Sequence, residues 1–142
     1  MPGILVGIDG SDHSRKALEW AVHEAGVRGT SLTVLAVHQV AANHWTGHPE
    51  TYASDAPETD MVRQAAEDAV QKAVSQVGGP APASVTVRAV TGVAAHELVA
   101  ASADADLVVV GSRGGGGFAR MVLGSVSSQV ESHAAAPVVV IR

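Results

Sequence analysis

The stretch that decides the fold of this chain runs from residue 107 to residue 117 and reads Leu107-Val108-Val109-Val110-Gly111-Ser112-Arg113-Gly114-Gly115-Gly116-Gly117. Its apolar start is uninterrupted, which is typical of a parallel strand that is buried on both faces. The glycines that follow predict a loop at the carboxyl end of that strand. A buried strand followed by such a loop is characteristic of an α/β protein.

Apolar runs elsewhere in the chain have the length of single strands and are separated by helical patterns. The first helical pattern has one apolar face and a predicted stop at Gly29. Pro57 is a suitable residue to open the second helix, and Gly78 ends it. Shorter helices are predicted over 93–103 and 119–133. The predicted strands are 4–8, 32–37, 85–90, 107–110 and 137–141.

The apolar faces of the two long helices identify candidate core residues. On the first helix they are Ala17, Leu18, Ala21, Val22 and Ala25. On the second they are Val62, Ala66, Ala69, Ala73, Val74 and Val77.

Alternating strands and helices predict one doubly wound, five-stranded parallel sheet with helices on both faces. The strand order 3-2-1-4-5 would bring the ends of the first and fourth strands together, where such sheets bind ligands. We expect a single domain over 1–142, because the chain has the length of one ordinary domain. Residues 41–56 are polar and aperiodic, and predict a long surface loop within it.

Composition excludes several classes of protein. Hydrophobic residues make up 46% of the chain, which is incompatible with general disorder, and there is no cysteine to form disulfides or thiolate zinc sites. The net charge is −5 with no run of Lys or Arg, so nucleic acid is not an expected partner. The apolar runs are too short to cross a membrane, and we see no signal peptide. We therefore expect a cytoplasmic protein.

Two predicted strand ends carry residues suited to a ligand. Asp9, Gly10 and Ser11 follow the first strand, and the glycine-rich loop follows the fourth. That loop leads into a helix beginning near Gly124 and Ser125, where backbone N–H groups and the helix dipole favour phosphate. Asp9 also fits a second role, as a cap of the first helix, and the two roles are compatible.

The glycine pattern distinguishes between kinds of phosphate site. The Gly-Lys-Ser/Thr of a Walker A loop is absent. A dinucleotide fingerprint on Gly114, Gly116 and Ala119 lacks the acidic residue about 20 positions further on, so we reject it. What remains is the spacing G-x2-G-x9-G-S, formed by Gly111, Gly114 and Gly124-Ser125.

This spacing, together with Val6-Gly7-Ile8-Asp9-Gly10-Ser11 and Leu107-Val108-Val109-Val110, resembles the ATP-binding branch of the universal stress protein family. The resemblance extends from Ile4 to Ile141 and implies an adenine-nucleotide α-hydrolase-like fold. It implies a nucleotide-dependent regulator of the stress response that is at most a slow ATPase, with Mg²⁺ or Mn²⁺ accompanying ATP.

The resemblance also implies which residues bind the nucleotide. Asp9 would lie beside the nucleotide, with Gly10 and Ser11 flanking the same crevice. The backbone of Val37 would meet the adenine. Gly111 and Gly114 would contact the ribose and phosphates, and the triphosphate would be held by Gly124, Ser125, Val126 and Ser127.

No residue stands out as catalytic, and we predict no metal site built by protein side chains alone. The chain has seven histidines. His44 and His48 have metal-like spacing, but they fall in an aperiodic loop without thiols. His13, His23, His96 and His133 fall on predicted helices and are expected to be solvated.

The last predicted strand, Val138 to Ile141, is an edge without a charged residue. A bare apolar edge invites pairing with another chain, and a two-fold pair of identical strands closes it. We therefore predict a homodimer through this strand, which the family resemblance also implies.

Three other functions remain open at this stage. The chain could prefer AMP or cyclic AMP, because adenine contacts through the backbone do not count phosphates. It could be a dimeric interaction module that needs no nucleotide. It could also be a ligase or nucleotidyl transferase of the wider α-hydrolase group, although 142 residues leave little room for a second substrate.

Overall fold

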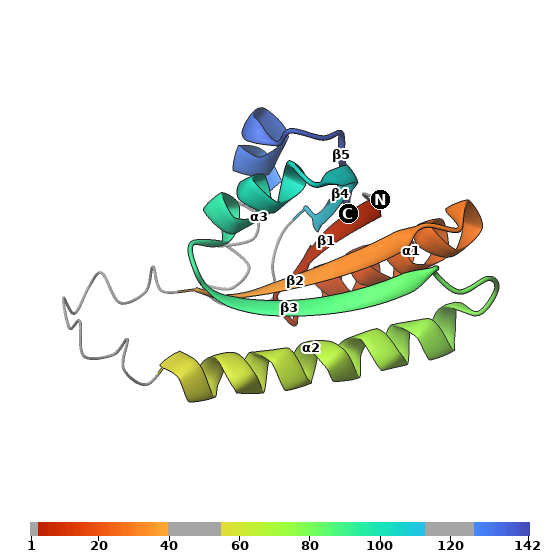
Figure 1. Ribbon diagram of the computed structural model, residues 1–142, viewed down its shortest axis with the longest axis horizontal. Coiled ribbons are helices and arrows are strands. Elements are labelled where there is room, and N and C mark those ends of the chain that lie inside the picture. The colour runs from red at the N-terminus through yellow and green to blue at the C-terminus, as the bar shows by residue number, and fades with distance from the viewer. Residues whose placement is uncertain (1–2, 40–54, 113–126) are drawn as a thin grey trace.

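The computed structural model describes residues 3–39, 55–112 and 127–142. It contains five parallel strands in one sheet, in the order β3-β2-β1-β4-β5, which confirms the predicted topology (Figure 1). The elements are β1 (Gly3–Ile8), α1 (Asp12–Arg28), β2 (Ser31–Gln39), α2 (Asp55–Val77), β3 (Ser84–Gly92), α3 (Ala94–Ser102), β4 (Ala105–Gly111) and β5 (Val138–Ile141). Residues 127–133 are also helical.

Helices cover both faces of the sheet because residues on the central strands alternate between two apolar cores. Ile4, Val6 and Ile8 of β1 face α1 and α2. Leu5 faces the opposite core, which contains Leu98 of α3 and Val130 of the 127–133 helix. In Figure 1 these two helical segments lie on one side of the sheet, and α2 lies on the other. The strands at the centre are therefore buried on both faces, as the uninterrupted apolar runs predicted.

The long helices follow the predicted faces with one correction. All five predicted core residues of α1 are buried, and α1 ends at Gly29 in the left-handed conformation (φ 63°). On α2 the prediction for Val74 was wrong: its side chain is 37% exposed, whereas Val70 is buried. The helix buries Ala66, Val70 and Ala73, whose steps of four and three residues keep them on one stripe.

Several boundaries differ by a few residues. α2 begins at Asp55, two residues before Pro57, and this overlaps the end of the predicted loop over 41–56. Proline is tolerated there because the first helical turn has no partner for its N–H. Residues 41–54 of that loop lie outside the described part of the chain, as do residues 119–126 of the last predicted helix.

Candidate functional site

The two strand ends that carry the candidate site residues are neighbours. β4 pairs directly with β1, and Val6 is aligned with Val109. Continuing this register places Ile8 opposite Gly111, so the segments after β1 and β4 leave the same edge of the sheet. This is the point at which the strand order reverses, where open parallel sheets form their ligand crevice.

The segment after β1 is a tight turn held by its own side chains. The Oδ1 atom of Asp9 accepts the backbone N–H of Ser11 at 2.9 Å. Gly10 adopts φ +86°, a conformation that suits glycine. Ser11 caps α1, because its Oγ accepts the backbone N–H of Ser14 at 3.2 Å. The helix cap is therefore Ser11, and Asp9 has the different role of fixing the turn that leads to it.

Ser14 completes this turn and was not singled out in the sequence. Its side chain is 1% exposed. Its Oγ accepts the N–H of Asp9 at 3.2 Å and donates to the carbonyl oxygen of Ser11 at 3.1 Å. The sequence signal is the Ser11-x2-Ser14 spacing, which resembles a capping box with serine in place of the usual acidic or amide residue.

The segment after β4 approaches the first turn of α1 very closely. A Cβ atom built on Gly111 would lie 3.1 Å from both the carbonyl carbon and the carbonyl oxygen of His13. Gly111 therefore has a steric reason to lack a side chain here, separate from any contact with a ligand. Beyond it, the N–H of Ser112 donates to the carbonyl oxygen of Ile141 at 2.7 Å, which joins this loop to β5.

His13 lies on the α1 side of that contact and is only partly exposed, so the expectation that it would be solvated was wrong in part. Its Nδ1 atom is buried and has no hydrogen-bond partner in the part of the chain that the structure describes. Unpaired buried nitrogen atoms are uncommon and costly. His13 thus adds an unused polar atom near the ends of β1 and β4, which the sequence did not reveal.

Val37 lies where β2 extends beyond β1. The register between these strands ends at the pair Ile8 and Ala36, so Val37 is one position past it. The register with β3 continues to Gln39. At Val37 the backbone of β2 therefore pairs with β3 but no longer with β1.

The remaining predicted site residues form the phosphate-binding part. Gly114, Gly124, Ser125 and Val126 lie outside the described residues. Ser127 begins the described helical segment and is buried. The structure therefore brings together Asp9, Gly10, Ser11 and Gly111, with Val37 one strand away, and leaves the triphosphate segment as a prediction.

The described residues do not assemble a metal site of their own. They contain no group of three or more His, Asp or Glu side chains that could hold an ion. In the turn after β1, the carboxylate of Asp9 also accepts a backbone hydrogen bond. A divalent cation at this edge of the sheet would thus need most of its oxygen donors from a bound small molecule and from water.

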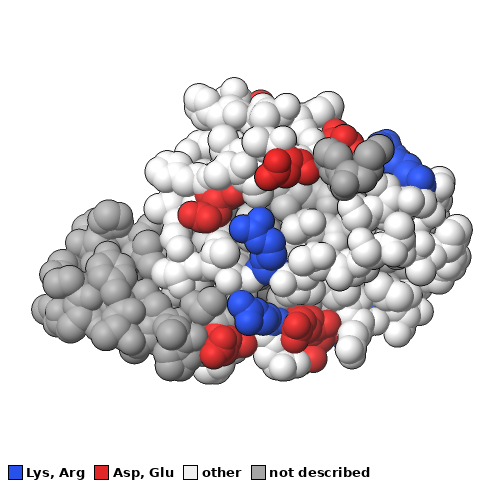
Figure 2. Space-filling model, viewed as in Figure 1, with Lys and Arg blue, Asp and Glu red and all other residues white. Residues whose placement is uncertain are grey.

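On the face shown in Figure 2, the Lys and Arg side chains lie singly among Asp and Glu, and no continuous basic patch forms there. None of the described helices combines the length and apolar character needed to cross a membrane.

Comparison with known proteins places this geometry in a family. The sequence matches the universal stress protein family over residues 2–142. The chain belongs to that family. Universal stress protein Rv2005c from Mycobacterium tuberculosis is 39% identical over 146 residues, an alignment that covers 99% of this chain and 48% of the relative. The chain spans about half the length of the curated relatives that it matches.

Solved universal stress proteins share the fold. UspA from Lactobacillus plantarum has 28% identity and a TM-score of 0.78, with 99% of this chain and 97% of that chain covered. A universal stress protein solved in complex with cAMP has 26% identity and a TM-score of 0.64, with coverages of 99% and 96%. A structure from Archaeoglobus fulgidus in complex with dAMP, at 23% identity and a TM-score of 0.63, supports the fold alone.

Proposed function

We propose that this universal stress protein domain binds an adenine nucleotide, with ATP as the preferred ligand, and acts as a nucleotide-dependent regulator in the stress response. The observation that carries the proposal is the convergence of the Asp9-Gly10-Ser11 turn with Gly111 at the strand-order reversal. The cAMP complex of a universal stress protein that is 26% identical to this chain supports adenine nucleotides as the ligand class.

The predicted contacts follow the edge of the sheet. The backbone of Val37, where β2 has passed the end of its pairing with β1, would bind the adenine. Asp9 would lie beside the nucleotide, and Gly111 would allow the ribose and phosphates to approach the backbone. Gly114 and the segment from Gly124 to Ser127 would hold the triphosphate through N–H groups and hydroxyls, with Mg²⁺ bound to the phosphates.

Binding is better supported than catalysis. In the described part of this edge, the Oδ1 atom of Asp9 accepts a hydrogen bond within the turn, and no group of three or more His, Asp or Glu side chains is assembled there. We therefore propose hydrolysis that is slow or absent. Turnover of MgATP at several per second by the purified protein would overturn the regulatory role, since that rate is within the ordinary enzyme range. We also propose that the protein is cytoplasmic, and cell fractionation tests this location.

The experiment is calorimetric titration of the nucleotide-stripped chain with MgATP, AMP and cyclic AMP in separate runs at about 150 mM salt, since phosphate contacts depend on ionic strength. The expected result is one site per chain, with MgATP bound most tightly. Tighter binding of cyclic AMP or AMP would reassign the ligand. No binding of any of the three would overturn the proposal and favour a nucleotide-independent interaction module.

Two variants locate the phosphate site. Gly114→Val should abolish binding by obstructing the phosphates. Ser125→Ala should weaken it by about 1–2 kcal/mol if the hydroxyl bonds a phosphate oxygen. Ser128→Ala, which changes an exposed serine of the described helix over 127–133, is the control and should bind normally. Normal affinity in both site variants would show that the nucleotide binds elsewhere.

We also propose that the protein forms a homodimer through Val138–Ile141. This strand pairs with β4 on one side and occupies the edge of the sheet. All four residues are apolar and only partly buried. Such an edge offers unpaired backbone groups along an apolar strand, which supports pairing with a second copy.

A further inference from the structure

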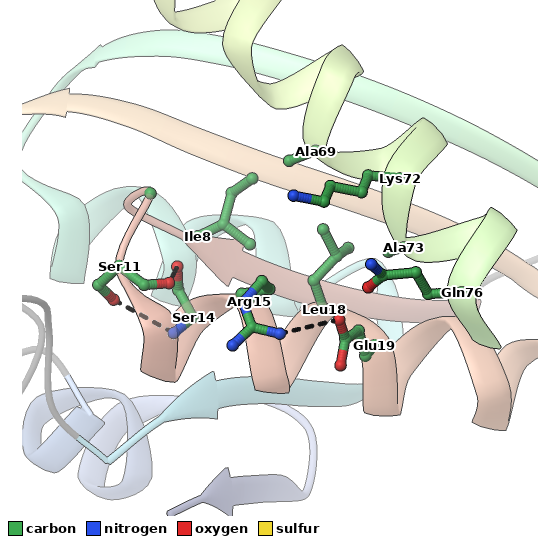
Figure 3. A pocket seen from close by; sticks show the side chains of 11 residues that line it. Ile8, Ser11, Ser14, Arg15, Leu18, Glu19, Ala69, Lys72, Ala73 and Gln76 are labelled. Atoms are coloured by element: carbon green, nitrogen blue, oxygen red, sulfur yellow. Dashed lines mark hydrogen bonds and ion pairs between the residues drawn. The ribbon is translucent and has the colours of Figure 1, made fainter.

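A cavity of about 200 Å³ lies between α1 and α2, on the flank of the molecule (Figure 3). It adjoins the crevice at the strand ends, because Gly10 and Ser11 of the turn after β1 also line it. Its lining comes from the end of β1, the first two turns of α1 and the second half of α2: Ile8, Gly10, Ser11, Ser14, Arg15, Leu18, Glu19, Ala69, Lys72, Ala73 and Gln76.

The floor of this cavity is apolar and buried. Ile8, Leu18 and Ala73 belong to the core beneath α1 and α2 and are almost completely buried. Ala69 and Ala73 are small, and their short side chains leave space between the two helices where longer ones would fill it. An apolar body placed here would exchange water contact for contact with these side chains, which is favourable.

The rim carries more positive than negative charge. The Arg15 guanidinium is paired with the Glu19 carboxylate at 3.2 Å. Lys72 reaches from α2 toward Ile8 across the cavity (Figure 3). Among the described residues Lys72 forms no ion pair. The ion pairs found there involve Arg15 and Arg28. Within the described residues, Lys72 is therefore a cation at this cavity without a carboxylate partner, on a chain whose net charge is −5.

We propose that this cavity is a binding site for a small amphipathic anion, with one ring or a short acyl chain as its body and a single carboxylate as its charged group. The size follows from the volume, since a cavity of about 150 Å³ accommodates benzene. The charge follows from Lys72, whose ammonium would receive the carboxylate while the body rests on Leu18 and Ala73. Gln76 supplies a side-chain amide at the same rim.

This proposal goes beyond nucleotide binding and does not rest on it. The residues that carry it are on α1 and α2, and none of Leu18, Lys72 or Ala73 is a proposed nucleotide contact. Because Ser11 lines the cavity and also caps the helix beside the crevice, the two ligands would share one structural element.

The test uses 4-fluorobenzoate as the probe and the full chain without nucleotide. Saturable broadening of its ¹⁹F signal should give a Kd of about 1 mM, as expected for a ligand of this size. Its neutral analogue 4-fluorobenzamide has the same ring and should bind at least threefold more weakly, because it lacks the charge that Lys72 recognises.

Two substitutions assign the binding to this cavity. Lys72→Gln should weaken the binding of 4-fluorobenzoate by about threefold to fivefold, the range of an ion pair at an exposed lysine. Its matched control is Lys16→Gln, at the only other lysine of the chain, which is exposed on α1 and does not line the cavity. Ala69→Leu should remove saturable binding by filling the space. Circular dichroism confirms that each variant is folded.

Three results would overturn the proposal. The first is no saturable broadening at concentrations tenfold above the expected Kd. The second is equal affinity for the benzoate and the benzamide, which would make the cavity an apolar site without preference for anions. The third is evidence that the probe binds elsewhere on the protein. Either an equal effect of Lys72→Gln and Lys16→Gln or no effect of Ala69→Leu would show this.

Discussion

Gly111, the last residue of β4, lies directly against the backbone of His13 in the first turn of α1. A Cβ atom at Gly111 would be 3.1 Å from the carbonyl group of His13, closer than side chains normally approach. No side chain separates the end of β4 from the helix that begins after β1. The two segments that frame the crevice are therefore in backbone contact and set one another's position.

The first prediction follows from this contact. Gly111→Ala should push the first turn of α1 away from β4, with a loss of about 1–3 kcal/mol in the free energy of unfolding. Affinity for MgATP should fall about tenfold, because the turn holding Asp9 shifts relative to the glycine-rich segment. Chemical denaturation and calorimetric titration measure the two effects.

Gly78→Ala is the control for that substitution. Gly78 has φ +68° and open space around it, so alanine there costs about 1–2 kcal/mol of backbone strain without a steric clash. Gly78 follows the end of α2 and belongs to neither of the two segments that frame the crevice. Nucleotide affinity should therefore be unchanged. Equal nucleotide affinity in both variants would contradict the idea that the contact between Gly111 and His13 shapes the crevice.

Ser14 provides the second prediction. Ser14→Ala removes the hydroxyl that accepts the N–H of Asp9 and donates to Ser11. The free energy of unfolding should fall by about 1–3 kcal/mol, since a part-buried donor loses its partner. The variant should also bind MgATP more weakly, because the turn that presents Asp9 loses one of its supports. Denaturant titration and calorimetry are the measurements.

The control for Ser14 is Ser132→Ala. Ser132 is exposed, and among the described residues its hydroxyl donates to the carbonyl oxygen of Ser128, one turn earlier on its own helix. Its loss should change stability by no more than about 0.5 kcal/mol. If Ser14→Ala were equally mild, the hydrogen bonds of Ser14 would contribute little to the turn.

Much of this architecture could be predicted from the order and length of its apolar runs. The predicted sheet order followed from placing β1 and β4, whose ends carry the candidate site loops, side by side. The buried face of α1 followed from the spacing of its apolar residues. The face of α2 was harder, because Val70 and Val74 are both apolar and only packing against the sheet shows that Val70 is the buried one.

The local geometry at the candidate site residues was predictable where a motif fixes the backbone and less so where it depends on packing, and nucleotide binding there stays a prediction. The turn at Asp9 to Ser11 and the glycine at 111 lie where the pattern placed them. Ser14 was missed because a serine inside a helix has no distinctive pattern of its own, and His13 was misjudged because its environment is created by β4, about 100 residues later. The cavity beside Lys72 forms between α1 and α2, so the sequence of neither helix alone predicts it.

His13 gives the third prediction. Among the described residues the buried Nδ1 atom of His13 has no hydrogen-bond partner, so replacing the ring with an apolar one should be neutral or favourable. We expect His13→Phe to raise the free energy of unfolding by about 1 kcal/mol in the absence of ligand. His23→Phe, on the exposed side of the same helix, is the matched control and should have little effect. Destabilisation by His13→Phe alone would indicate that the Nδ1 atom has a partner in solution.

The fourth prediction tests the proposed homodimer by removing one hydrogen-bond donor from the edge of the sheet. The N–H of Val108 donates to Pro137, and that of Ser112 donates to Ile141. Because backbone groups alternate along a parallel ladder, the N–H of Val140 points away from β4 and that of Val139 points toward it. Proline is tolerated at edge positions whose N–H faces outward.

Val140→Pro should therefore convert the dimer to a monomer by light scattering while the fold is retained by circular dichroism. Val139→Pro is the matched control: it removes the N–H directed at β4 and should lower the melting temperature instead, because it breaks a bond within the chain. A monomeric mass for the unmodified protein at micromolar concentration would remove the basis for the dimer. A dimer that persists in Val140→Pro would place the interface on another surface, since the outward edge of β5 would then have lost a donor without consequence.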